Sequence, residues 1–346
     1  MPFHTAISRH KPGGLTEFLA PQRLRLLLAV IGLLMCTPAL QAARIKLPNG
    51  DLFEGEIVDG QRTGAGVYTW ANGNRYEGSF RNNRLEGRGI YLWPDGRRYE
   101  GNFVADRREG EGILRWPNGN RYEGSFAANE MDGEGTFVWK NGDIYSGAFA
   151  AGERTGRGRF VWHTGEIYEG DFVGGVPQGN GRFLWPDGRE YLGQFNNSLK
   201  NGSGEFSWPN GNRYLGQFSN DQRQGLGVFY WRDGTIYRGQ FLANRMHGYG
   251  VKQLPDGGMD LQQWTAGELK STRPLKAVNH CQFELAGREY MFDSNDCING
   301  LAHGNGLAVS LDGQLLIPDA RIVLGQLVDG QVEYLVAAFD SSSEDS

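Results

Sequence analysis

Alternating apolar and polar positions run through most of the chain, and the alternation repeats with a period of 23 residues. In the second unit the aromatic and glycine residues occupy every second position of two segments. Such spacing places side chains on one face of a β-strand, so each unit is predicted to be a hairpin of two strands. Nine units follow one another without insertion, starting at Phe53, Tyr76, Tyr99, Tyr122, Tyr145, Tyr168, Tyr191, Tyr214 and Tyr237.

A short turn signal joins each hairpin to the next. In Trp93-Pro94-Asp95-Gly96, proline suits the second position of a type I turn and Asp the third, and Gly accepts the positive φ that follows. The connection is too short for a crossover, so successive strands are predicted to pair antiparallel in one sheet.

A sheet of one layer has no second layer to bury its apolar face, and the glycines offer a solution. A row of strand glycines leaves gaps in which aromatic rings from a neighbouring strand can lie flat. Burying each ring stabilises the fold by about 1.5–3 kcal/mol. The sequence therefore predicts an all-β fold, an elongated single-layer antiparallel sheet. The residues expected to build it are Tyr76, Gly78, Phe80, Gly87, Gly89, Trp93 and Gly96.

The pattern YEGxF…GxGxxxWxxG, seen from Tyr76 to Gly96, resembles the MORN (membrane occupation and recognition nexus) repeat. The resemblance covers nine tandem repeats over residues 53–259 and implies a twisted array of β-hairpins. It implies no single function, because MORN arrays serve as scaffolds, lipid-associated modules and dimerisation segments, and also accompany unrelated catalytic domains.

The N-terminal residues 1–42 have the features of a signal peptide. Basic residues precede an apolar run from Leu26 to Cys36, and small residues suited to cleavage follow up to Ala42. An uncleaved anchor is the alternative. Residues 43–52 form a lead-in half-repeat. Export predicts an extracytoplasmic location, periplasmic or secreted, and membrane-anchored if the signal is not cleaved.

Residues 260–339 break the strict period and are predicted to form a small β-rich cap that contains a degenerate repeat. Gly304-Asn305-Gly306 followed by Asp312-Gly313 keeps the repeat spacing. Cys281 and Cys297 are predicted to form a disulfide in an oxidising compartment, with two unpaired thiols as the alternative. Residues 340–346 form an acidic tail without core-forming side chains, predicted to be disordered.

Outward positions in the late units are apolar where earlier units carry charged residues. An apolar patch of this kind should be covered, either by the chain's own C-terminal segment or by a second copy in a homodimer. The candidate interaction surface consists of Leu192, Leu215, Val228, Tyr230, Tyr249 and Val251.

Charge and motif content narrow the function. The net charge is −5, which disfavours nucleic acid as a partner. The sequence has no metal-ligand spacing, nucleophile elbow or phosphate loop, so no catalytic residue, metal or cofactor is expected. We therefore expect a non-catalytic scaffold for protein–protein interaction or self-association. The alternative is an envelope module whose aromatic groove binds glycan or membrane lipid headgroups.

Overall fold

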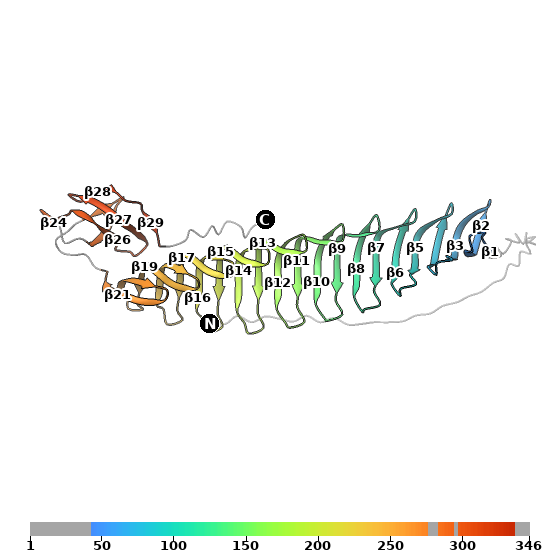
Figure 1. Cartoon of the computed structure of the whole chain (residues 1–346), viewed down its shortest axis with the longest axis horizontal. Helices are drawn as coiled ribbons and strands as arrows, with labels where there is room; N and C mark the ends of the chain where they lie inside the picture. Colours follow the sequence, from blue (N-terminus) through green and yellow to red (C-terminus); the bar gives the residue numbers. More distant parts are fainter. Residues whose placement is uncertain (1–42, 276–282, 294–296, 336–346) are drawn as a thin grey trace, which may run out of the picture. The chain divides into compact units, whose positions relative to one another are not determined.

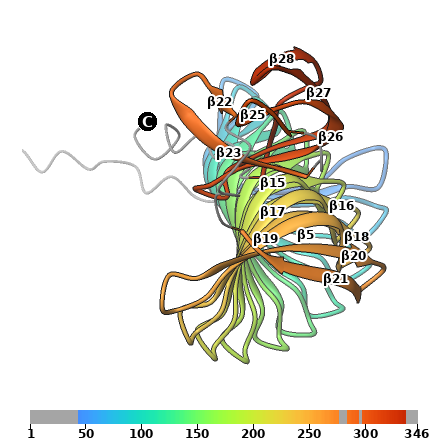
Figure 2. The same ribbon diagram turned by 90° about the vertical axis from the view of Figure 1, so that its left-hand side faces the viewer.

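The structure, a computed structural model, describes residues 43–275, 283–293 and 297–335. These residues form strands and turns, and no helix long and apolar enough to cross a membrane occurs among them. The predicted all-β fold is therefore confirmed. Figure 1 shows the strands of the repeat region side by side in a row, and seen end-on they fan out, as expected for the twist of a β-sheet (Figure 2).

The repeat region is one antiparallel sheet of 21 strands, called the array below. Its strands are β1 (Ala43–Lys46), β2 (Leu52–Val58), β3 (Gln61–Thr69), β4 (Arg75–Arg81), β5 (Arg84–Leu92), β6 (Arg98–Val104), β7 (Arg107–Arg115), β8 (Arg121–Ala127), β9 (Glu130–Val138), β10 (Ile144–Ala150), β11 (Glu153–Val161), β12 (Ile167–Val173), β13 (Val176–Leu184), β14 (Glu190–Asn196), β15 (Leu199–Ser207), β16 (Arg213–Ser219), β17 (Gln222–Tyr230), β18 (Ile236–Leu242), β19 (Arg245–Gln253), β20 (Met259–Thr265) and β21 (Glu268–Pro274).

Two kinds of tight turn alternate along the array. Within a hairpin, Asn82 and Asn83 both have positive φ, 50° and 69°, as a two-residue type I′ turn requires. Between hairpins, the Gly96 N–H donates to the Trp93 carbonyl at 3.0 Å, with Gly96 at a φ of 88°. The short connections leave each strand paired with the strands before and after it in sequence.

The glycine pairs lie directly beneath the tyrosine rings. Gly78 of β4 pairs with Gly89 of β5, and a Cβ added to Gly89 would lie 2.3 Å from Cε2 of Tyr76. Tyr76 itself is 0% exposed. Gly87 has a different role, because its φ is +67° and the nearest atom to an added Cβ would be 3.7 Å away. Backbone conformation therefore requires glycine at Gly87, whereas close ring contact requires it at Gly89.

The buried rings form a continuous series of edge-to-face contacts. Tyr76 meets Phe80 of its own strand at 5.2 Å and Phe103 of the next unit at 5.1 Å between ring centroids, with interplanar angles of 90° and 83°. This geometry is a favoured one for aromatic pairs. The contact recurs from unit to unit, so neighbouring hairpins stabilise one another.

The sheet continues beyond residue 259. β20 and β21 form a further hairpin of the array, in which Trp264 takes the place of the repeat phenylalanine and Gln262 the place of a glycine. β21 is exposed along almost its whole length. It carries Lys270 and ends at Pro274, residue types that discourage further strand pairing at a sheet edge.

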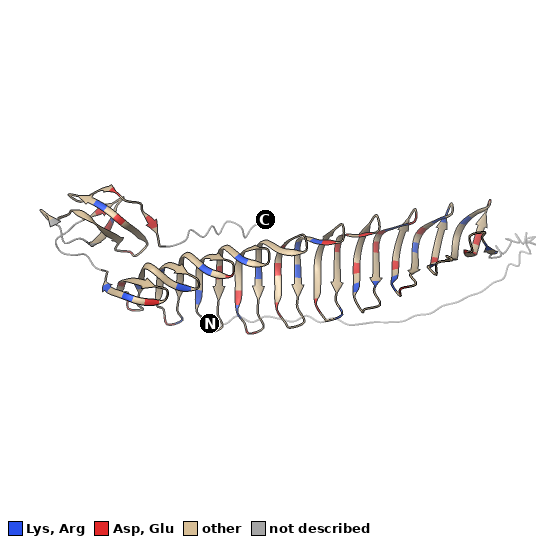
Figure 3. Ribbon diagram, viewed as in Figure 1, with Lys and Arg blue, Asp and Glu red and all other residues tan. Residues whose placement is uncertain are grey.

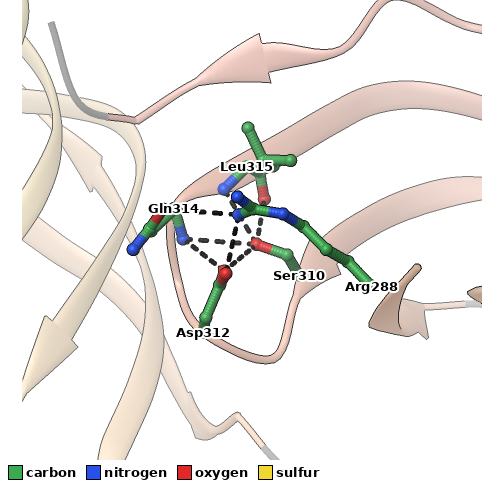
Figure 4. A network of polar contacts seen from close by, with 5 residues as sticks. All are labelled: Arg288, Ser310, Asp312, Gln314 and Leu315. Atoms are coloured by element: carbon green, nitrogen blue, oxygen red, sulfur yellow. Dashed lines mark hydrogen bonds and ion pairs between the residues drawn. The ribbon is translucent and has the colours of Figure 1, made fainter. Parts of the chain in front are cut away.

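The C-terminal strands form separate small sheets. β26 and β27 are joined by a turn in which the Gly313 N–H donates to the Ser310 carbonyl at 2.8 Å, the bond seen between hairpins of the array. Arg288 fastens this turn through Asp312, whose carboxylate also accepts from the Ser310 hydroxyl (Figure 4). The strands are β22 (Glu284–Leu285), β23 (Arg288–Asp293), β24 (Cys297–Ile298), β25 (Leu301–Ala302), β26 (Gly304–Ser310), β27 (Leu315–Val323), β28 (Gln326–Asp329) and β29 (Glu333–Tyr334).

The predicted disulfide lies outside the described residues, since Cys281 is not among them and only the backbone of Cys297 is. The signal segment 1–42 and the tail 340–346 lie outside them as well.

Candidate functional site

A row of tryptophans lies beside the buried tyrosines on the same face of the array, called the aromatic face below. Each tryptophan directly follows the second strand of its unit and packs against the repeat core. Trp139, for example, packs at a tilt between Phe137 and Phe160, with ring centroids 4.4 Å and 5.2 Å away. All members of the row are half-buried, so part of each indole reaches solvent: Trp70, Trp93, Trp116, Trp139, Trp162, Trp185, Trp208 and Trp231.

The tenth position of each unit also contributes to the aromatic face. The guanidinium of Arg108 lies over three rings, 5.6 Å from Trp93, 5.5 Å from Tyr99 and 5.3 Å from Phe126. Its Nη2 also donates to the carbonyl of Asn129 in the next loop. Arg62, Arg154 and Arg223 repeat this arrangement on their own rings and loops.

Burial lowers the pKa of the Arg108, Arg154 and Arg223 guanidinium groups, because partial removal from water disfavours a charge. Cation–π contact offsets part of that cost. Arginine side chains keep their proton in proteins at neutral pH. Arg108, Arg154 and Arg223 therefore place positive charges on the aromatic face.

A hollow of about 380 Å³ opens on this face near the beginning of the array. The Nε of Arg62, which lines it, is buried and has no hydrogen-bond partner among the described residues. The other lining residues are Tyr68, Trp70, Phe80, Asn83, Leu85, Tyr91 and Asp106. A second hollow of about 340 Å³, more open, lies beside Trp231 and is lined also by Asn212, Arg232 and Asp233.

The six residues predicted as an interaction surface lie on the opposite face and differ in exposure. Leu192 is 44% exposed, and Leu215 and Tyr230 are half-buried. Val228 and Val251 are buried, at 1% and 0%. Val251, with Tyr249 packed against it, belongs to a hydrophobic cluster that includes Leu307, Val309 and Leu316 of the C-terminal sheet.

The structure places the predicted structural residues together. Tyr76, Gly78, Phe80 and Gly89 meet at one hairpin, while Trp93 and Gly96 form its outer turn. Sequence reasoning missed the tenth-position cations as candidate binding residues. A signal existed, because basic and apolar residues occur in turn at one fixed repeat position, but that position is not invariant.

The chemistry available on the aromatic face is that of binding. Among residues 43–275, 283–293 and 297–335, no group of three His, Cys, Asp or Glu side chains could hold a metal ion. Aromatic edges, guanidinium donors and shallow hollows are suited to a ligand that lies along the surface.

The fold defines a tandem β-hairpin repeat protein. The MORN repeat model matches the chain in nine consecutive stretches, which makes up more than half of it, so the chain belongs to the MORN repeat family. The matched residues are 53–75, 76–97, 99–121, 122–144, 145–167, 168–188, 191–213, 214–236 and 237–259. No curated protein sequence matches the chain at a significant level.

Two solved structures show a distant likeness to the chain. The wild-type TCP10 domain of Danio rerio CPAP is 15% identical with a TM-score of 0.34, over 67% of this chain and 99% of that one. The SAS-4 (dCPAP) TCP domain of Drosophila melanogaster, in complex with a proline-rich motif of Ana2 (dSTIL), is 18% identical with a TM-score of 0.31, over 51% and 90%. At these scores neither likeness carries a functional conclusion for this chain.

Proposed function

We propose that the chain is a non-catalytic scaffold that holds a partner protein along its aromatic face. The observation that carries the proposal is the difference in burial between the tyrosine and tryptophan rings. The tyrosines that build the array are fully buried, whereas every tryptophan of the neighbouring row is half-buried and reaches solvent. Half-exposed tryptophan and arginine side chains are enriched where proteins bind one another.

We also propose that the scaffold works outside the cytoplasm, periplasmic or secreted. The support is the leader pattern of residues 1–42, with basic residues before an apolar run and small residues after it. Export predicts that the isolated protein begins near Ala43. Mass spectrometry of the purified protein tests this, and an intact chain recovered from the cytoplasm would overturn it.

The binding proposal is tested by site-specific crosslinking with a photoreactive amino acid. Met131 lies half-buried on the aromatic face, and Glu123 is exposed on the opposite face of the neighbouring strand, so the two positions form a matched pair. We expect protein adducts from position 131 and few from position 123. Adducts of lipid or glycan at position 131 would favour the envelope-ligand alternative, and adducts of the chain with itself would favour a homodimer.

A further inference from the structure

We propose that the aromatic face binds an extended acidic segment of a partner protein, in which carboxylate side chains recur about every six residues with apolar side chains between them. This inference rests on the proposed scaffold function and deepens it by naming the chemistry of the partner. Three observations carry it: the order of residues at the tenth position, the lack of an ion pair at four of the five cations and the hollow beside Arg62.

The tenth position alternates between basic and apolar residues from unit to unit. Basic residues stand in the first, third, fifth and seventh units, and apolar ones in the second, fourth and sixth. The alternation ends at the eighth unit, where a second basic residue follows directly. The full series is Arg62, Leu85, Arg108, Met131, Arg154, Pro177, Lys200, Arg223 and Met246.

Four of these cations form no ion pair. No carboxylate of the described residues forms an ion pair with Arg62, Arg108, Arg154 or Arg223, and within the series only Lys200 is paired, with Asp221 at 2.6 Å. The chain has carboxylates in plenty, 40 in all, and charged residues are spread along the whole array (Figure 3). Unpaired charges on the aromatic face therefore do not reflect a shortage of acids.

On the opposite face, arginine side chains pair with glutamates of the same chain. There Arg75 pairs with Glu77 and Arg98 with Glu100, each at 2.8 Å, and Arg121 pairs with Glu123. Half-buried guanidinium groups without counter-ions are costly. A carboxylate supplied from outside would relieve that cost, because the planar guanidinium matches a carboxylate through two parallel hydrogen bonds.

The spacing of the cations sets the spacing of the acids. Alternate units are four strands apart, which at about 4.8 Å per strand is roughly 19 Å. An extended chain rises about 3.3 Å per residue, so about six residues span that distance. The apolar tenth-position residues lie midway and offer contact to aliphatic or aromatic side chains between the acids.

The hollow near the beginning of the array lies between two members of this series. It lies between the basic residue of the first unit, Arg62, and the apolar residue of the second, Leu85, and both line it. A carboxylate bound there would lie close to the Arg62 guanidinium, and Leu85 and Tyr91 would border the next apolar side chain.

Fluorescence anisotropy with labelled 20-residue peptides tests the inference on the purified chain. The probe peptide carries Glu at every sixth residue with Leu and Ala between, and its control carries Gln in place of each Glu. We expect the Glu peptide to bind at least tenfold more tightly, with an affinity that falls as salt rises. Equal binding of both peptides would overturn the proposal.

Two triple variants locate the site. R62Q/R108Q/R154Q removes three cations from the aromatic face, and R75Q/R98Q/R121Q removes three from the opposite face, so the change in net charge is the same. We expect the first to weaken the Glu peptide at least tenfold and the second less than twofold. Equal losses would show non-specific attraction and overturn the proposal. If the first variant loses its circular dichroism spectrum, Arg108→Gln alone is used, with a three- to fivefold loss expected.

Vesicles distinguish an acidic protein segment from an anionic lipid. Vesicles of phosphatidylcholine with one-fifth phosphatidylserine are added to the wild-type chain and to both triple variants. Binding of vesicles that requires Arg62, Arg108 and Arg154, without binding of the Glu peptide, would overturn the proposal in favour of lipid. Protein crosslinks at position 131 without binding of the Glu peptide would leave the scaffold function standing and overturn only the acidic partner.

Discussion

The repeat tyrosines differ in their hydroxyl contacts: seven have a hydrogen-bond partner, and the last has none among the described residues. In the seven, the hydroxyl donates to the carbonyl three residues further on, as Tyr122 does to Ser125 at 2.9 Å. The seven donors are Tyr76, Tyr99, Tyr122, Tyr145, Tyr168, Tyr191 and Tyr214. The hydroxyl of Tyr237 is buried without a hydrogen-bond partner among the described residues. Replacing tyrosine by phenylalanine should therefore change the free energy of unfolding differently at Tyr122 and at Tyr237.

We expect Tyr122→Phe to lower the free energy of unfolding by about 1 kcal/mol, since a buried hydrogen bond is lost. Tyr237→Phe should leave it unchanged or raise it slightly, because no bond is lost and an unsatisfied polar group is removed. Urea titrations followed by tryptophan fluorescence measure both. Equal losses in the two variants would contradict the assignment of the hydroxyl partners.

The buried tyrosines also predict how stability depends on pH. Burial raises the pKa of Tyr99 and of Tyr145 to about 12, against about 10 in an unfolded chain. The folded state therefore favours the protonated phenol. This contribution is fully present below pH 10 and is lost as the pH rises through 12. It amounts to at most about 3 kcal/mol per tyrosine, at 1.36 kcal/mol per unit of pKa.

Urea midpoints measured from pH 8 to pH 12 check this dependence. We expect little change up to pH 9.5 and a steep fall above it. The double variant Y99F/Y145F should fall less steeply, since two of the titrating groups are gone. A wild-type midpoint that stays constant through pH 11.5 would show that these phenols do not titrate with unfolding.

At the scale of the hairpin, the tyrosine ring and the glycine pair form one unit. A Cβ on Gly158 would lie 2.5 Å from Cε2 of Tyr145, so Gly158→Ala should destabilise the array by about 3 kcal/mol through overpacking. In a Tyr145→Leu background the same change should cost at least 1 kcal/mol less, because the smaller side chain leaves room. Thermal and urea unfolding of the four proteins in this double-mutant cycle measure the coupling, and simple additivity would contradict the contact.

The hairpins were predictable because their determinants are local. Pro94-Asp95-Gly96 and the period of two specify strands and turns without knowledge of distant residues. The role of Gly87 was harder to predict. A period of two assumes a regular strand, whereas this strand has a register irregularity opposite Gly78 and Ser79. The cation contacts of Arg108 were not predictable, because they join Trp93 of one unit to Tyr99 and Phe126 of the next two. The sequence did not predict which segment buries Val251, because the C-terminal segment of the same chain and a second copy would bury it equally well.

At the scale of the whole array, stability should accrue by nearest-neighbour contacts. Deleting residues 122–144 removes one complete unit and preserves the register of every remaining strand. We expect this variant to fold and to unfold at a slightly lower urea concentration. Deleting residues 121–129 removes strand β8 with its turn and brings two second strands together, so the strand register fails. Size-exclusion chromatography and circular dichroism compare the two, and equal behaviour would contradict the hairpin as the unit of assembly.

The single-layer arrangement has a mechanical consequence. The strands lie across the array, so the backbone hydrogen bonds between them point along it. Tension applied to the two ends of the array therefore peels one strand at a time, whereas a sheet pulled along its strands resists with all its bonds together. Each released hairpin frees 23 residues, about 75 Å of extended chain at 3.3 Å per residue. The array should thus yield at low force in equal steps, and work as an extensible tether between whatever its two ends are attached to.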